Sequence, residues 1–427
     1  MSEFANLPSQ ELTKYRADLR ARYEAYRGRG LKLDMTRGKP GSDQLDLTNE
    51  LLSNLAPSDI KGSDGSDVRN YGGLDGLPEM KAIFGEMLSA PADQVVIGGN
   101  SSLQIMHDSV VRALLHGVVG GQGPWFSQRP KFLCLVPGYD RHFAICQHHG
   151  IEMINVELTP EGPDMDRIEA LVAADASIKG LWCVPKYSNP TGTTYSSSTV
   201  ERLALMKTAA ADFRIFWDNA YVVHDLYDAT DPLDDILAAC AKAGNPNRVY
   251  VFGSTSKISF AGAGVAAMAA SPQNVADIKQ HLSFQTIGPD KVNQLRHCRL
   301  FKNMDGVRAH MKKHAAVIRP KFEAVISQFD KDLAGKGIAD WTRPRGGYFI
   351  SLNTLDGCAA EVIRMADAAG VKLTSAGATF PYGKDPRDRN IRVAPTLPPL
   401  AQVELAMEVV CCCVELVSAE RLLASKA

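Results

Sequence analysis

The chain has 427 residues, 45% of them hydrophobic, and a formal net charge of −1 at pH 7. This length is sufficient for a large core and favours two domains over one. Because the charges almost cancel, the composition gives no indication of binding to nucleic acid or to an anionic membrane. We expect the basic run over 308–314 to be a solvated helix face.

The N-terminal residues lack the basic and apolar regions of a secretory signal, and no apolar run approaches the ~18 residues of a membrane span. The nine cysteines, an odd number in apolar contexts, predict reduced thiols in the cytoplasm. Cys411, Cys412 and Cys413 are adjacent, and neighbours on a helix do not share a face. We therefore interpret them as buried small apolar residues, and we expect no metal site.

Helical spacing predicts a helix over 10–30, followed by extended chain over 31–40. Strand-like apolar runs then alternate with helical patterns. This alternation predicts an α/β fold in which a mostly parallel, seven-stranded sheet lies between helices. The predicted strands are 94–97, 132–136, 152–156, 180–184, 213–217, 249–252 and 265–270.

A second, α+β region is predicted towards the C-terminus, after a long helical stretch that begins near Lys291 and continues past 325. Its extended segments are 341–352, 371–374 and 390–394, and its helices are 358–369 and 399–423. We expect the N-terminal segment to pack with this smaller domain and make it discontinuous. The expected division is 1–65, 66–305 for the large domain, and 306–427 for the small domain.

Polar side chains follow several predicted strands at their carboxyl ends, which is where sites form in open α/β sheets. They are Tyr139, Asn189, Asp218, Tyr221 and Lys257. Each has an ordinary explanation: a packing ring, a turn, a helix cap or a solvated cation. Together they place several functional groups at one edge of the sheet.

These groups match the requirements of pyridoxal 5′-phosphate, which needs a lysine for its aldehyde, a carboxylate for its ring nitrogen and an aromatic stacking partner. Its phosphate needs backbone N–H groups at a helix N-terminus together with hydroxyls. The strand–turn–helix pattern over 95–104, with Ser101 and Ser102, is a candidate for this role. No Gly-Lys-Ser/Thr follows, which argues against an ATP-type loop.

The ordered motifs Ser-Asn-Pro-Thr-Gly over 188–192, Asp-x-x-Tyr over 218–221 and Ser-x-Ser-Lys over 254–257 resemble those of fold-type I pyridoxal-phosphate aminotransferases, class I/II. The resemblance extends from 36 to 392. Further segments are similar to an atypical bacterial subgroup, the Corynebacterium-like aspartate aminotransferases. These segments are 36–40, 67–76, 136–142, 162–166 and 254–264.

The resemblance implies a role for each residue around the cofactor. Lys257 would bind the aldehyde as an imine and then carry protons, and Asp218 would pair with the ring nitrogen. Asn189 and Tyr221 would hydrogen-bond the phenolic oxygen, and Tyr139 would stack on the ring. The phosphate would be held by Ser101, Ser102, Ser254 and, from the neighbouring subunit of a homodimer with shared sites, Tyr71.

For the substrate, the resemblance implies that Arg392 clamps the α-carboxylate, beside Asn189 and the backbone of Gly38. The subgroup favours aspartate as donor and 2-oxoglutarate as acceptor in ping-pong transamination. A dicarboxylate also needs a distal cation, for which Arg141 is one candidate. The others are Arg37, Arg69, His142 and Lys186.

One departure from the family concerns the phosphate. Most relatives have an arginine about eight residues after the lysine, where this chain has Val265. The Asp-Arg-His over 140–142 is a candidate replacement. Three alternatives stay open: another donor such as alanine or an aromatic amino acid, a β-lyase or decarboxylase of the same fold, and a non-catalytic effector-binding module.

Overall fold

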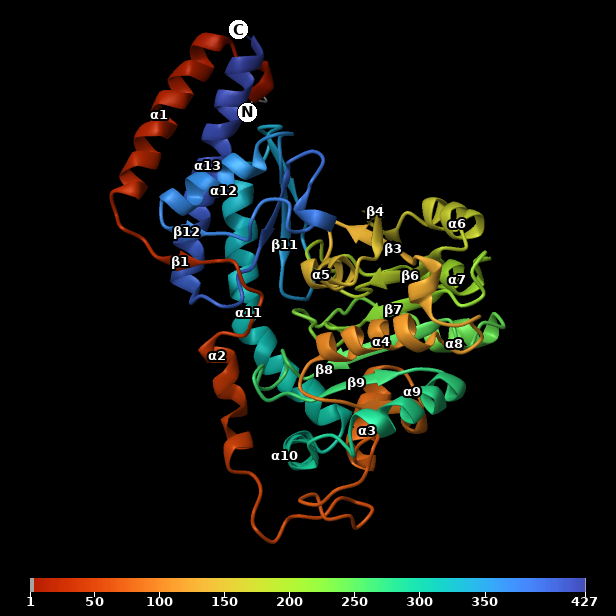
Figure 1. The fold of residues 1–427 in the computed structure, drawn as a ribbon. Coiled ribbons are helices and arrows are strands. Elements are labelled where there is room, and N and C mark those ends of the chain that lie inside the picture. The colour runs from red at the N-terminus through yellow and green to blue at the C-terminus, as the bar shows by residue number, and fades with distance from the viewer. Residues whose placement is uncertain (1–3, 427) are drawn as a thin grey trace.

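The computed structural model describes residues 4–426 and contains one large sheet of eight strands (Figure 1). The pairs along β8–β7–β6–β3–β4 are parallel, whereas β9 is antiparallel to both of its neighbours. The mostly parallel sheet is confirmed, and the two-residue β5 adds a strand too short to predict from alternation. In spatial order the strands are β2 (Val95–Ile97), β9 (Ala266–Ala269), β8 (Val249–Ser254), β7 (Arg214–Asp218), β6 (Ile178–Cys183), β3 (Lys131–Val136), β4 (Glu152–Thr159) and β5 (Gly162–Pro163).

Both faces of this sheet are covered by helices because its strands are apolar on both sides. Phe132, Cys134 and Val136 of β3 pack into one hydrophobic cluster, and Leu133 and Leu135 pack into another. The first cluster includes residues of α4 (Ser102–His116), α5 (Asp140–His148) and α9 (Pro272–Gln285). The second includes residues of α3 (Pro78–Met87), α6 (Met165–Ala174), α7 (Ser197–Leu205), α8 (Ile236–Lys242) and α10 (Lys291–Phe301).

A second region joins the two ends of the chain. Its antiparallel sheet has the order β10 (Ala339–Trp341), β11 (Ile350–Thr354), β13 (Asn390–Val393), and β1 (Leu33–Asp34) pairs with β12 (Val371–Lys372). Helix α11 runs from beside α3 to beside α13, and α1 lies along α13 (Figure 1). The helices of this region are α1 (Ser9–Arg27), α2 (Ser42–Leu45), α11 (Met304–Asp332), α12 (Ala359–Ala368) and α13 (Leu400–Lys426).

The three adjacent cysteines on α13 are all fully buried, as predicted. They point to different neighbours: Cys411 Sγ lies 3.9 Å from the carbonyl oxygen of Gln328 on α11, and Cys412 Sγ lies 3.7 Å from that of Leu19 on α1. The cysteines therefore help to fill the space between α1, α11 and α13. Within residues 4–426, no group of three or more His, Cys, Asp or Glu side chains is placed to hold a metal ion.

The basic run over 308–314 is only partly a solvated face. Lys312 and Lys313 are exposed, but His310 and His314 are buried. His310 Nε2 lies 2.9 Å from the carbonyl oxygen of Ile258 and 3.0 Å from Nε2 of His314. The prediction was wrong for these histidines because α11 turns them towards the Lys257 segment.

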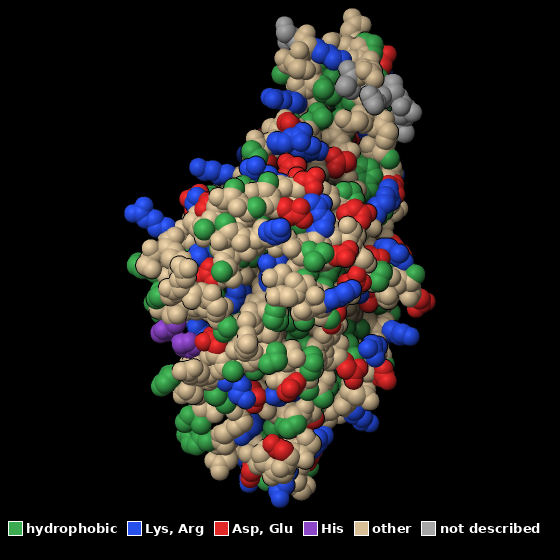
Figure 2. Space-filling model, turned by 90° about the vertical axis from the view of Figure 1, so that its right-hand side faces the viewer, with side chains coloured by type: hydrophobic (Ala, Val, Ile, Leu, Met, Phe, Trp, Pro, Cys, Tyr) green, Lys and Arg blue, Asp and Glu red, His purple; other side chains and the backbone are tan. Residues whose placement is uncertain are grey.

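The surface carries both signs of charge. Figure 2 shows basic and acidic side chains interspersed over one face of the molecule, without a large field of one sign. Among the described helices, none is long and apolar enough to span a bilayer.

Candidate active site

Five strands, β2, β3, β6, β7 and β8, end at one edge of the large sheet, and the predicted polar residues follow them there. Tyr139 follows β3, Asn189 follows β6, Asp218 ends β7 and Lys257 lies three residues beyond β8. The parallel pairing of β7 with β8 sets Asp218 opposite Phe252. The topology therefore brings together groups that are about 120 residues apart in sequence.

Asp218 has one carboxylate oxygen held and one free. Oδ2 lies 3.1 Å from Nε2 of His142, and both side chains are almost fully buried. Oδ1 is buried without a hydrogen-bond partner among the described residues. His142 stacks on Trp182 at a centroid distance of 4.4 Å and meets the Tyr139 ring edge-on at 4.9 Å. A buried, unpaired carboxylate oxygen is costly, so the site is built to receive a hydrogen-bond donor there.

The Lys257 amine lies in an aromatic enclosure. Nζ is 5.0 Å from the centroid of the Tyr221 ring and 5.9 Å from that of Tyr348. Burial lowers the pKa of Lys257, and the charge of Asp218 opposes this shift. Burial also raises the pKa of Tyr221 well above its usual value. The lysine therefore loses its proton more readily than a surface lysine does.

Two side chains contact the backbone carbonyl oxygen of Lys257. Its carbonyl oxygen lies 3.3 Å from His224 Nε2 and 3.3 Å from the hydroxyl of Tyr348. Burial lowers the pKa of His224 to about 3, with the Lys257 charge as a further cause. A neutral His224 can donate its Nε2 proton to this carbonyl, which fixes the segment that carries the amine.

Several serine hydroxyls lie at or near the start of α4. Ser101 precedes the helix in extended conformation, and its side chain makes no capping hydrogen bond. Ser256 Oγ donates to the Asn100 carbonyl oxygen at 3.1 Å, and Ser254 Oγ donates to Ser256 Oγ at 3.1 Å. Ser102 is the first residue of the helix. Free N–H groups at such a helix end attract anions.

The Val265 side chain does not point towards these serines. Its side chain is buried in the core cluster shared with α3 and α10. Its backbone N–H donates to Thr255 Oγ1 at 2.9 Å, and its carbonyl oxygen accepts from the Thr255 N–H at 2.8 Å. Of the candidate replacements, His142 contacts Asp218 and Arg141 is exposed on α5.

Arg392, on β13, presents one edge of its guanidinium group. Nη1 donates to Asp140 Oδ1 at 2.8 Å and to Asn189 Oδ1 at 3.3 Å. Nη2 has one long contact of 3.5 Å with Thr374 Oγ1, and the buried Nε has no partner among the described residues. The Nε and Nη2 edge is therefore available for a bidentate carboxylate.

Gly38 lies near Arg392, and both residues contact the ring of Phe349. The Arg392 guanidinium carbon is 5.0 Å from the centroid of the Phe349 ring. A Cβ on Gly38 would lie 2.1 Å from Cζ of the same ring, so no other residue fits there without displacing it. This contact places Gly38, which belongs to the N-terminal segment, on the Arg392 side of the site.

The candidate distal cations fall into two groups. Lys186 pairs with Asp225 at 2.9 Å, Arg69 pairs with Asp67 at 2.7 Å, and His142 contacts Asp218. Arg37 and Arg141 are exposed and form no ion pair with any described residue. The structure thus leaves two of the five candidates without a competing carboxylate.

Tyr71 does not join the other predicted residues within one chain. Its side chain is 82% exposed, on a loop whose Tyr71 and Gly72 carbonyl oxygens accept from Lys291 Nζ at 3.3 and 2.8 Å. The exposed apolar side chains Phe284 and Ile287 belong to the segment just before Lys291.

Sequence reasoning missed several of the contacts that hold the site. Asp140 and Thr374 contact Arg392, His224 and Tyr348 hold the Lys257 backbone, and His142 contacts Asp218 although it was expected as a cation for the substrate. His224 lies only three residues beyond Tyr221, which was the one local signal for it. The other contacts join distant segments and leave no mark in the sequence pattern.

The mixed sheet between helices, with a lysine and a carboxylate at its strand ends, is the architecture of the fold-type I aminotransferases. A Thermus thermophilus α-aminoadipate aminotransferase shares this fold at a TM-score of 0.72 and 21% identity, covering 93% of this chain and 94% of the other.

Relatives with higher sequence identity indicate the family within this fold class. The aspartate aminotransferase of Corynebacterium glutamicum is 46% identical over 413 residues, covering 96% of this chain and 95% of the relative. A solved aspartate transaminase from C. glutamicum superimposes with a TM-score of 0.96 at 45% identity, covering 98% and 99% of the two chains. A Mycolicibacterium smegmatis protein is 51% identical over 409 residues, 95% of each chain.

The family described as aspartate amino-transferase matches residues 7–426. The chain therefore belongs to the aspartate aminotransferase family and is an aminotransferase. The β-lyase, decarboxylase and effector-binding alternatives are accordingly not retained.

Proposed function

We propose that the protein uses pyridoxal 5′-phosphate to transfer the amino group of aspartate to 2-oxoglutarate. The observation that supports this best is Asp218, whose Oδ2 contacts His142 while the buried Oδ1 has no partner among the described residues. An oxygen in this position suits the protonated ring nitrogen of the cofactor. When bound, the cofactor supplies an aldehyde that takes up the amino group and a ring that delocalises electrons.

The residues at the strand ends fit the remaining parts of the cofactor. Tyr139 offers a ring to stack on, and Asn189 and Tyr221 offer hydrogen bonds to the phenolic oxygen. The N-terminus of α4 with Ser101, Ser102 and Ser254 offers N–H and hydroxyl donors for the phosphate. These donors would carry the phosphate charge without help from residue 265, because the Val265 side chain is uncharged and buried in the core.

Lys257 is the proposed base. Its amine loses a proton readily because burial lowers its pKa more than the charge of Asp218 raises it. Nζ would act as the base that takes the proton from the substrate Cα and then as the acid that gives a proton back later in the reaction. His224 and Tyr348 would keep this amine in position through the Lys257 carbonyl oxygen.

The substrate would bind on the Arg392 side of the site. Nε and Nη2 would form two parallel hydrogen bonds to the α-carboxylate, while Asp140 and Asn189 keep the guanidinium oriented. Arg37 and Arg141 are the candidates for the distal carboxylate, since neither pairs with a described carboxylate. Aspartate is favoured because the C. glutamicum relative carries the name aspartate aminotransferase.

The proposal includes a homodimer with shared sites. Tyr71 is 82% exposed, which suits a ring that completes the phosphate site of a partner subunit. The nine free, buried cysteines support a reducing compartment, the cytoplasm. We also propose the division into 1–65, 66–305 and 306–427, supported by the packing of α1 on α13.

The test is an absorbance spectrum of the purified protein before and after addition of aspartate. We expect a visible cofactor band that disappears with aspartate and returns with 2-oxoglutarate, with glutamate as product. Parallel assays with alanine, aromatic and branched donors define the substrate. A clear preference for a non-acidic donor would refute aspartate, and absence of the band after reconstitution would refute the cofactor.

A further inference from the structure

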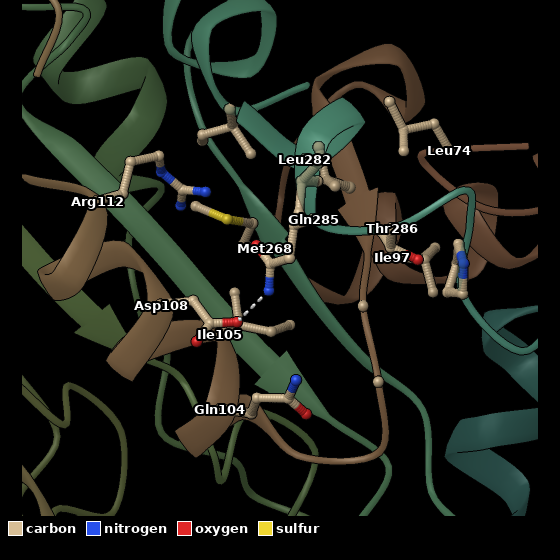
Figure 3. Close-up of a pocket in the computed structure, with 15 residues that line it drawn as sticks. Leu74, Ile97, Gln104, Ile105, Asp108, Arg112, Met268, Leu282, Gln285 and Thr286 are labelled. Atoms are coloured by element: carbon tan, nitrogen blue, oxygen red, sulfur yellow. Dashed lines mark hydrogen bonds between the residues drawn. The ribbon is translucent and has the colours of Figure 1, made fainter. Parts of the chain in front are cut away.

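A cavity of about 280 Å³ lies between α4, α9 and the β2–β9 edge of the large sheet (Figure 3). This volume is close to the lower end of the ~300–1,000 Å³ of typical ligand pockets. Its walls are largely apolar and include Val96, Ile105, Met268, Ile278 and Leu282. None of the cofactor or substrate residues described above lines this cavity, so the proposed reaction does not account for it.

One cation faces this apolar space. Figure 3 shows the Arg112 guanidinium beside Met268, between Leu282 and Ile105. Arg112 Nη2 donates to Ser109 Oγ at 3.2 Å, and within residues 4–426 the side chain forms no ion pair. Burial lowers the pKa of Arg112, and the charges of Tyr250, Asp277 and Asp108 oppose this shift; arginine stays charged at neutral pH. A half-buried guanidinium without an ion pair is costly, and an anion bound to it would offset that cost.

The one carboxylate in the cavity wall already has hydrogen-bond partners. Asp108 Oδ2 accepts from Gln285 Nε2 at 3.0 Å, and Asp108 Oδ1 lies 3.3 Å from His107 Nδ1. Asp108 and Arg112 are four residues apart on α4, so both lie on the face that borders the cavity. The cavity thus combines a guanidinium without an ion pair among the described residues, a carboxylate with hydrogen-bond partners and apolar walls.

We propose that this cavity binds a small organic carboxylate, with its anionic group on Arg112 and its apolar body against Met268, Leu282 and the neighbouring aliphatic side chains. The fork geometry of arginine suits a planar carboxylate, and the walls provide hydrophobic surface for a short hydrocarbon or aromatic body. Both simple or 2-oxo acids and apolar α-amino acids share this chemistry. The ammonium of an amino acid would be placed beside Asp108.

The position of the cavity connects it with both proposed phosphate-binding elements, a point that rests on the proposed function. Gly98, Gly99 and Gln104 line it at the start of α4, next to Ser101 and Ser102. Leu74 lines it from the loop that carries Tyr71, in which the Gly72 carbonyl oxygen accepts a hydrogen bond from Lys291. Thr286 lines it from the segment just before Lys291. A bound carboxylate would therefore change cofactor affinity, and the cofactor would change carboxylate affinity by the same factor.

The experiment uses calorimetry on the purified full-length protein without added cofactor, so its result does not depend on catalysis. The probes are 3-phenylpropanoate, its neutral analogue 3-phenylpropan-1-ol, and phenylalanine. In an Arg392→Met background, which removes the proposed carboxylate clamp of the active site, we expect one 3-phenylpropanoate bound per chain, at least tenfold more tightly than the alcohol. Tighter binding of phenylalanine would identify amino acids as the ligand class, and weaker binding would identify acids without an ammonium.

Two variants assign the site. Arg112→Met should weaken 3-phenylpropanoate binding at least tenfold, because it removes a charge-assisted hydrogen bond. Leu282→Trp, which fills the cavity, should weaken both the acid and the alcohol. Arg167→Met, at an exposed arginine on α6, is the matched control and should leave the carboxylate affinity unchanged.

Three results would overturn the proposal. They are no binding to the wild-type protein, binding that persists in both Arg112→Met and Leu282→Trp, and binding only to a dissociated monomer. The last would show that a second copy of the chain fills the cavity in solution. A cofactor affinity that does not respond to a carboxylate bound at this site would remove only the coupling.

Discussion

The two halves of the candidate site place their cationic side chains in different surroundings. In the strand-end half, around Asp218 and Lys257, the lysine amine lies among aromatic rings, and it forms no ion pair with any described residue. In the second-sheet half, around Arg392, the guanidinium pairs with Asp140 at 2.8 Å and contacts Asn189. A desolvated, unpaired amine suits proton transfer, whereas a guanidinium fixed on one side suits binding.

The largest expected effect tests the strand-end half. Lys257→Ala removes both the covalent anchor and the proton carrier, so transamination should fall by about 10⁴-fold or more. Turnover of aspartate with 2-oxoglutarate measures this, and circular dichroism checks the fold. Lys242→Ala, at an exposed position on α8, is the control. Wild-type activity in the Lys257 variant would contradict the proposed mechanism.

Arg392→Lys tests the second-sheet half. It keeps the charge but loses the fork, so kcat/KM for aspartate should fall about 10²-fold while the cofactor absorbance stays unchanged. Arg389→Lys, at a half-buried arginine paired with Asp340, is the matched control. If the Arg392 variant also lost the cofactor absorbance, substrate binding and cofactor binding could not be assigned separately to the two halves.

His142→Phe sharpens the description of the strand-end half. A phenyl ring can still stack on Trp182, but the contact with Asp218 Oδ2 is lost. The dissociation constant of the cofactor should rise about tenfold, which a spectroscopic titration measures. His148→Phe, at an exposed position on the same helix, should leave it unchanged. Equal affinities for the two variants would count against His142 as the residue that orients Asp218.

The smallest effect concerns acid. His224 has a folded-state pKa of about 3, below the ordinary 6.5, so the unfolded chain takes up a proton that the folded chain does not. The free energy of unfolding should therefore decrease as pH falls through this window, by about 1 kcal/mol from His224 between pH 6.5 and 5.5. Urea unfolding at the two pH values measures this difference.

A variant separates this contribution from that of other groups. His224→Gln keeps a donor for the Lys257 carbonyl oxygen but cannot take up the proton, so the pH dependence should be weaker by that amount. His148→Gln, whose imidazole is exposed on α5, should keep the wild-type dependence. An unchanged slope in His224→Gln would show that His224 is not the group that titrates.

The strand-end half could largely be predicted from the sequence. Tyr139, Asn189, Asp218 and Lys257 each lie at or just beyond the end of a predicted apolar strand, and parallel strands end at a common edge. The contacts of His142, His224 and Asp140 could not be predicted. They depend on side-chain directions across elements whose sequence separation ranges from 33 to 252 residues.

The sequence by itself determined the alternation of strands and helices, the class of chemistry at the strand ends and the burial of the three cysteines on α13. These properties follow from local periodicity and from the chemistry of single residue types. Only the tertiary structure decided that His142 contacts Asp218, that His310 and His314 face inward, and that Arg112 faces an apolar cavity unpaired. Such pairings depend on packing between distant segments, which no local pattern encodes.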